Sequence, residues 1–231
     1  MGDVNLIAQI IPLAWAAAVS PTALSLFLIT MSMSDNPKLS GLSFYVGAIF
    51  VLLLTVFLGI FLGSALTSTG HGDPATTGAI DLFLGAILVL LGIKSFFSKS
   101  HGKNSSLIKY LRIDVQASNF AKFRQYFTIG LLTFLTNLST AIFILAAGRE
   151  IGLAKTGIWV DVGAIVLLTL ITLIVIEVPL LFFVLMPKSA EKVSEPMDKW
   201  LSKHSNLVMA IFLLIIGFLV IYNGISHLKI I

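Results

Sequence analysis

Residues 42–66 read LSFYVGAIFVLLLTVFLGIFLGSAL, a stretch that contains no charged side chain. An α-helix rises about 1.5 Å per residue, so a run of this length crosses the roughly 30 Å hydrocarbon core of a bilayer. Lipid offers no hydrogen-bond partners to free backbone groups, and a single segment satisfies its own backbone only as a helix. We therefore predict that Leu42–Leu66 is a transmembrane helix.

The composition of the whole chain indicates the same class. Of its 231 residues, 57% are hydrophobic and only 11% are charged, and the mean hydropathy is +1.01. Soluble domains carry about 25% charged residues. The net charge of +4 does not indicate a nucleic-acid partner, because the basic residues lie in short segments between long apolar runs. We expect an all-α integral membrane protein surrounded by the lipid bilayer.

Six apolar runs are long enough to span the membrane, and turn residues such as Ser34-Asp35-Asn36-Pro37 separate them. The chain contains no cysteine, which excludes disulfides and thiolate metal sites. We expect no metal and no cofactor. The predicted spans are Leu6–Met33, Leu42–Leu66, Gly78–Phe97, Tyr126–Ala147, Ile158–Met186 and Leu207–Ile225.

The basic residues predict the orientation of these spans in the cell membrane. Twelve of the 15 Lys and Arg residues lie in the first, third and fifth loops, and the remaining three are Arg149, Lys155 and Lys229. Loops rich in Lys and Arg stay in the cytoplasm. We therefore expect both termini outside and the long, basic central loop in the cytoplasm.

The two halves of the chain share three short motifs in the same order. Val46-Gly47-Ala48-Ile49 recurs as Val162-Gly163-Ala164-Ile165, Ser20-Pro21-Thr22 has the counterpart Asn137-Leu138-Ser139, and Ile87–Gly92 corresponds to Phe212–Gly217. The alternative explanation is convergent apolar composition.

Three spans per half mean that the second copy enters the membrane from the opposite face. We expect two inverted three-helix repeats, residues 1–97 and 126–231, joined by a basic loop at 98–125. Secondary transporters with this architecture bind their substrates near the midplane, where the halves meet.

Polar residues gather near the middle of the first and fourth spans. Pro21 lacks an N–H, so the Ala17 carbonyl loses its helical partner and the helix should bend. Hydroxyl and amide groups beside such a bend can bind a polar group or an ion. Interhelical hydrogen bonding without a ligand is the alternative. The candidate substrate-binding residues are Ser20, Pro21, Thr22, Thr136, Asn137, Ser139 and Thr140.

Glu177 is the one carboxylate deep in a predicted span, and Pro179 follows it. A charge at that depth costs several kcal/mol unless it faces the bundle interior, is paired or takes up a proton. No Lys or Arg lies at a similar depth in the sequence. We therefore predict that Glu177 couples transport to a proton or cation. A structural carboxyl group bonded to a backbone carbonyl is the alternative.

Other polar and small residues have structural explanations. Asp81 and Asp161 lie near predicted helix starts, where a carboxylate is favoured. Arg149 is expected at the membrane interface, at the end of the fourth span. Small residues such as Gly59 and Gly63 permit close helix packing, which can include the subunit contact of a homo-oligomer.

These features resemble the lysine-exporter superfamily, and most closely its GAP branch of glycolipid-addressing proteins. The resemblance rests on six spans, a basic central loop, Ser20-Pro21 in the first span and Thr136-Asn137 in the fourth. It implies export of amino acids or metal cations or, for the GAP branch, movement of lipids and glycolipids to the cell surface. The usual Asn-Pro of the fourth span reads Asn137-Leu138 here, so no proline accounts for a second kink.

We predict a transporter, either an exporter or a flippase, that moves a small polar or lipid-like substrate by alternating access. A membrane-embedded enzyme would need a clustered nucleophile and base, or metal ligands, within the spans, and only one lone carboxylate, Glu177, lies deep within them. We therefore do not expect an enzyme. The remaining alternatives are an accessory or scaffold protein of the cell envelope and an amino-acid or cation exporter.

Overall fold

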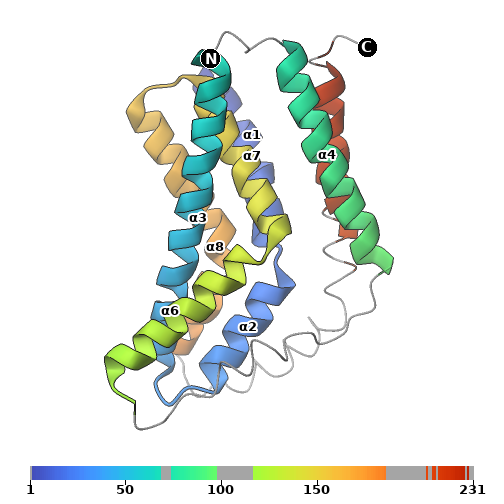
Figure 1. Ribbon diagram of the computed structural model, residues 1–231. Coiled ribbons are helices and arrows are strands. Elements are labelled where there is room, and N and C mark those ends of the chain that lie inside the picture. The colour runs from blue at the N-terminus through green and yellow to red at the C-terminus, as the bar shows by residue number, and fades with distance from the viewer. Residues whose placement is uncertain are drawn as a thin grey trace.

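The computed structural model describes most of the chain, and the regular structure of the described part is α-helical (Figure 1). The described residues are 2–68, 74–97, 117–185, 207, 210–211, 213–226 and 228. Their helices are α1 (Gly2–Ala18), α2 (Pro21–Ser32), α3 (Pro37–Ser68), α4 (Pro74–Phe97), α6 (Asn119–Leu135), α7 (Leu138–Ala154), α8 (Ile158–Leu185) and the apolar helix Leu213–Ser226.

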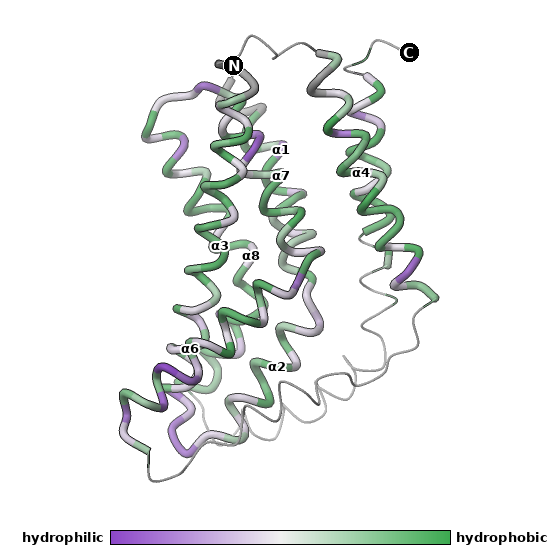
Figure 2. The backbone as a smooth tube through the Cα atoms, viewed as in Figure 1, coloured by the Kyte–Doolittle hydropathy of each residue, from purple (hydrophilic) through white to green (hydrophobic). Residues whose placement is uncertain are grey.

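By length and composition, three helices can each cross a membrane: α3, α4 and α8. Two further pairs, α1 with α2 and α6 with α7, qualify when each bent pair counts as one span. Figure 2 shows that apolar residues dominate along these helices. The chain is therefore a multi-pass membrane protein with three to five candidate spans in its described part. The sixth predicted span is described over Leu213–Ser226 only, so the count of six remains a prediction.

The first and fourth predicted spans are broken rather than continuous. The axes of α1 and α2 differ by 53°, and those of α6 and α7 differ by 75°. The second break is the sharper one, although no proline lies in it. The central loop at 98–116 and the fifth loop at 186–206 lie outside the described residues, and α6 already begins at Asn119.

Helix α3 packs against both halves of the second broken pair, α6 and α7, whereas α8 packs against both halves of the first, α1 and α2. Helix α1 also lies along α7. In Figure 1, α4 and the Leu213–Ser226 helix form a separate pair beside this bundle. The start of α1 and the end of the Leu213–Ser226 helix lie at the same end of the molecule.

Glycines bring α3 and α7 into backbone contact. A Cβ added at Gly59 would lie 2.4 Å from the Leu145 carbonyl oxygen, and one added at Gly148 would lie 2.5 Å from the Val56 carbonyl oxygen. Gly63 and Gly152 make equally close approaches along the same crossing. Glycines permit this close spacing because they have no side chain between the two helices. Gly59 and Gly63 therefore serve packing within one chain.

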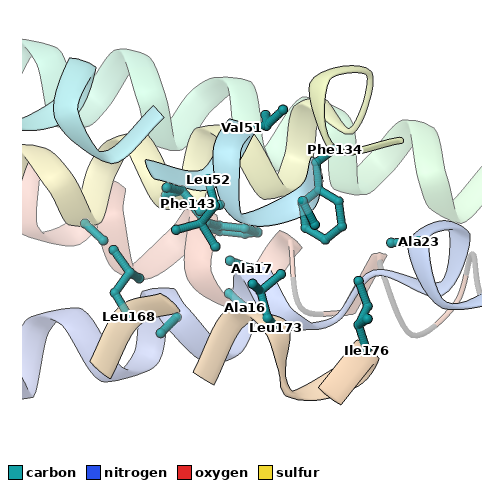
Figure 3. Close-up of a cluster of buried hydrophobic side chains, with 14 of the residues drawn as sticks. Ala16, Ala17, Ala23, Val51, Leu52, Phe134, Phe143, Leu168, Leu173 and Ile176 are labelled. Carbon is teal, nitrogen blue, oxygen red and sulfur yellow. The ribbon is translucent and has the colours of Figure 1, made fainter. Parts of the chain in front are cut away.

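Large apolar side chains from both halves fill the centre of the bundle (Figure 3). Phe143 of α7 and Leu52 of α3 are fully buried beside Ala16 and Ala17 of α1, and Leu173 of α8 closes the other side. The small side chains of Ala16 and Ala17 let neighbouring helices approach the first break closely. The core therefore surrounds the region where the broken helices meet.

Candidate functional site

The first break is capped by Ser20. Its backbone leaves the helical region (φ −126°, ψ 85°), and its Oγ accepts a hydrogen bond from the Ala23 N–H at 3.3 Å. Pro21 follows as the first residue of α2, where a missing N–H is tolerated. The predicted bend is therefore confirmed, and it takes the form of a helix end and a new helix start.

The second break is capped by Asn137 in the same way. Its backbone is also non-helical (φ −85°, ψ 77°), and its Oδ1 accepts hydrogen bonds from the Thr140 N–H at 3.5 Å and the Ser139 hydroxyl at 3.0 Å. Asparagine is among the strongest N-cap residues because its side chain replaces the missing helical acceptor. The asparagine cap starts a new helix here without a proline.

The two breaks contact each other directly. The Asn137 Nδ2 donates a hydrogen bond to the Ser20 Oγ at 2.5 Å. The Thr140 hydroxyl donates to the Ala17 carbonyl at 3.2 Å, and this is the carbonyl that Pro21 deprives of its helical partner. Ser20 and Thr140 are almost completely buried. Residues 117 positions apart thus form one polar contact inside an apolar core.

Two other predicted residues lie apart from this contact. Thr22 is exposed on α2, and the exposed Thr136 donates its hydroxyl to the Leu132 carbonyl of its own helix at 2.7 Å. The structure thus brings Ser20, Asn137, Ser139 and Thr140 together, with Pro21 at the same break.

Glu177 forms a separate polar contact. Its Oε1 accepts a hydrogen bond from the Tyr45 hydroxyl of α3 at 2.7 Å, and both side chains are half-buried. The structure thus places a phenol of another helix beside this carboxyl group. Sequence reasoning missed Tyr45, although its position in an apolar span indicated a need for a hydrogen-bond partner.

Asp81 does not lie where the sequence suggested, and it forms an ion pair with Arg149. Arg149 is only 3% exposed, within a helix that continues to Ala154, and its guanidinium forms an ion pair with Asp81 of α4. Asp81 is two turns inside α4 rather than in its first turn, so the helix-start explanation is wrong for it. Asp161 does lie in the first turn of α8, as expected. The buried charges of Arg149 and Asp81 each provide the partner that the other needs.

Thr172 of α8 is a second residue that the sequence did not single out. It is 1% exposed, and its hydroxyl has no hydrogen-bond partner among the described residues. A buried hydroxyl without a partner costs stability. It is therefore a polar group in the core that a ligand or an ordered water can satisfy.

A family model described as SfLAP (Sap, sulfolipid-1-addressing protein) matches residues 10–226. This chain belongs to that family. The matched range contains both helix breaks, Glu177 and the Arg149–Asp81 pair. This lipid-addressing family agrees with the predicted resemblance to glycolipid-addressing proteins. The resemblance to the lysine-exporter superfamily stays a prediction. Neither a curated protein nor a solved structure matches the chain.

Proposed function

We propose that this SfLAP-family protein transports a lipid-like amphiphile across the membrane by alternating access, as an exporter or flippase. The hydrogen bond between Asn137 and Ser20 carries the proposal, because it joins two helix breaks at corresponding places in the two halves. Discontinuous helices in corresponding positions form the midplane sites of secondary transporters. The family description, which names the addressing of a sulfolipid, supports a lipid-like cargo.

The helix directions support two inverted halves. The first broken pair, α1 with α2, and the second, α6 with α7, run in opposite directions through the molecule (Figure 1), as two inverted copies would. The counterpart glycines Gly47 and Gly163 differ in their surroundings. A Cβ added at Gly47 would lie 2.3 Å from the Phe127 carbonyl oxygen, whereas one added at Gly163 would have no atom within 4 Å. In this proposal the structure represents a closed state, since Ser20 and Thr140 are buried.

Opening would separate the two caps and free their polar atoms. The Ser20 hydroxyl, the Asn137 amide and the Ala17 carbonyl would then each lose a partner within the chain. Buried polar groups without partners are costly, so a polar group of the substrate can replace the lost hydrogen bonds. Glu177, bonded to Tyr45, is the proposed coupling group for a proton or cation.

A lipid-translocation assay tests this function. Purified protein in liposomes is given a fluorescent glycolipid analogue, and external dithionite measures how fast the label changes leaflets. We expect Asn137→Ala and Thr140→Val to slow translocation at least about tenfold, the effect of losing one well-made buried hydrogen bond.

Two matched variants serve as controls. Thr140→Ser keeps the hydroxyl that reaches the Ala17 carbonyl, and Thr136→Val removes a hydroxyl that bonds only within its own helix turn. Both should retain translocation. If liposomes that contain the wild-type protein do not move the labelled lipid between leaflets, but accumulate an amino acid or a cation, an amino-acid or cation exporter would be favoured. Absence of any transport would favour an accessory or scaffold protein.

A further inference from the structure

Glycines hold α3 against both halves of the second broken pair. In each couple of facing glycines, the carbonyl three residues before one glycine fills the space that the other leaves without a side chain. A Cβ added at any of these glycines would lie 2.2–2.5 Å from a carbonyl oxygen of the opposite helix. The couples are Gly47 with Gly130 of α6, Gly59 with Gly148 of α7, and Gly63 with Gly152 of α7.

These reciprocal contacts fix the register of three helices. Residues that carry a Cβ lie next to the glycines, for example Ala48 and Leu131. If α3 slid along α6 or α7, carbonyl oxygens would press against such Cβ atoms instead of the glycines. Real Cβ atoms essentially never come within 3.0 Å of such an atom, so the helices keep one register. Helices α3, α6 and α7 therefore form one rigid unit, the glycine-locked group.

The described residues give α1, α2 and α8 no lock of this kind. Helices α1 and α2 contain no glycine after Gly2. A Cβ added at Gly163, the single glycine of α8, would have no atom within 4 Å. One added at Gly41 of α3 would meet side-chain atoms of Leu180 and Met31. Flexible side chains can move aside where a backbone cannot, so these three helices are the less tightly held.

Hydrogen bonds between distant helices lie on the boundary between the glycine-locked group and these three helices. Each joins a side chain of the glycine-locked group to α1, to the cap of α2 or to α8. The three contacts are Asn137–Ser20, Thr140–Ala17 and Tyr45–Glu177. A hydrogen bond contributes little net stability when water or a ligand can replace it. The boundary is therefore the place where the helices can separate at the lowest cost.

We propose that α1, α2 and α8 move together against the glycine-locked group, which stays fixed. The assignment rests on the proposed alternating access and gives the two halves unequal roles. Ser20 and Glu177 would travel with the moving helices, whereas Asn137 and Tyr45 would stay in place. One movement then breaks both the contact between the two caps and the contact of the proposed coupling group. This gives Glu177 a physical connection to the substrate site.

Pulsed electron paramagnetic resonance on the full chain in liposomes tests the assignment. The chain has no cysteine, so pairs of nitroxide labels can be placed without background. Phe120→Cys on α6 is paired with Phe61→Cys on α3 inside the glycine-locked group, and with Trp159→Cys or Leu185→Cys at either end of α8. All four side chains are at least 70% exposed.

The distances are compared in a background that weakens the boundary. Asn137→Ala and Tyr45→Phe together remove two of its hydrogen bonds. Thr136→Val is the matched control, because its hydroxyl bonds only within its own helix turn. Each single substitution is measured as well, so a double variant that fails to fold does not decide the outcome.

We expect both distances to α8 to shift by about 2 Å or more, the scale of helix shifts between states. The distance between α3 and α6 should stay as in the parent, and Thr136→Val should shift none of the three. A changed distance between α3 and α6, or unchanged distances to α8, would overturn the assignment. The measurement needs no transport, so its failure is distinct from failure of the proposed function.

Discussion

At the residue scale, Thr140 shows how the chain accommodates a proline in an apolar core. Pro21 removes the donor for the Ala17 carbonyl, and an unpaired carbonyl in lipid would cost several kcal/mol. The Thr140 hydroxyl of the other half supplies that donor. The break in one half is therefore stabilised by a residue of the other, which links the local conformation of α1 to the position of α7.

Glu177 provides a prediction at the same scale. If its carboxyl group carries the coupling proton, Glu177→Gln should abolish the pH dependence of lipid translocation, because a glutamine cannot titrate. Tyr45→Phe removes the phenol that donates to this carboxyl group and should alter the pH profile of translocation. Translocation rates measured from pH 5 to 8 provide the profile.

Tyr222→Phe is the matched control for Tyr45→Phe. Tyr222 is 66% exposed on the C-terminal helix, so removing its hydroxyl should leave the profile unchanged. A Glu177→Gln variant that retains the full pH dependence of the wild type would refute the coupling role. The Glu177–Tyr45 hydrogen bond would then have a structural role.

At the element scale, two different chemical devices produce similar helix breaks. Ser20 and Pro21 form the first break, and Asn137 with Ser139 and Thr140 forms the second. Proline signals the first break in the sequence. The second has no such signal, because an asparagine in a helix can equally bond to a neighbouring helix.

The close crossing of α3 and α7 predicts which glycines are replaceable. Gly59→Ala places a methyl group 2.4 Å from the Leu145 carbonyl oxygen and 2.9 Å from the backbone nitrogen of Arg149, so the helices must move apart. We expect loss of about 1–3 kcal/mol of stability, typical of overpacking. Gly163→Ala adds the same group where nothing lies within 4 Å and should be neutral or stabilising. Thermal unfolding of both variants in detergent measures the difference, and equal melting temperatures would contradict the close crossing.

At the scale of the whole molecule, the ion pair between Arg149 and Asp81 connects α7 of the bundle to α4 of the neighbouring helix pair. A buried pair of this kind stabilises little overall, but removing one partner leaves a buried charge. The two charges therefore restrict how α4 can be placed against the bundle.

The orientation in the membrane gives a whole-molecule prediction. The chain has no cysteine, so a single introduced thiol reports its own side without background. Lys38 follows the first residue of α3, Ala154 is the last residue of α7, and both are exposed. The start of α3 and the end of α7 lie at opposite ends of the molecule (Figure 1). A membrane-impermeant maleimide added to intact cells should label Ala154→Cys and not Lys38→Cys, because loops rich in Lys and Arg remain in the cytoplasm. The reverse pattern would contradict the orientation, and labelling after lysis confirms that both thiols are reactive.

The sequence by itself determined the membrane class, the positions of the apolar helices and the bend at Pro21, because each depends on local length, hydropathy or a missing N–H. It also drew attention to Asn137 and Glu177, since polar groups are expensive in lipid. Only the tertiary structure decided their partners. The contacts Asn137–Ser20, Thr140–Ala17, Glu177–Tyr45 and Arg149–Asp81 join residues at least 68 positions apart. Such partners depend on how the helices cross, and spacing along the chain does not determine that geometry.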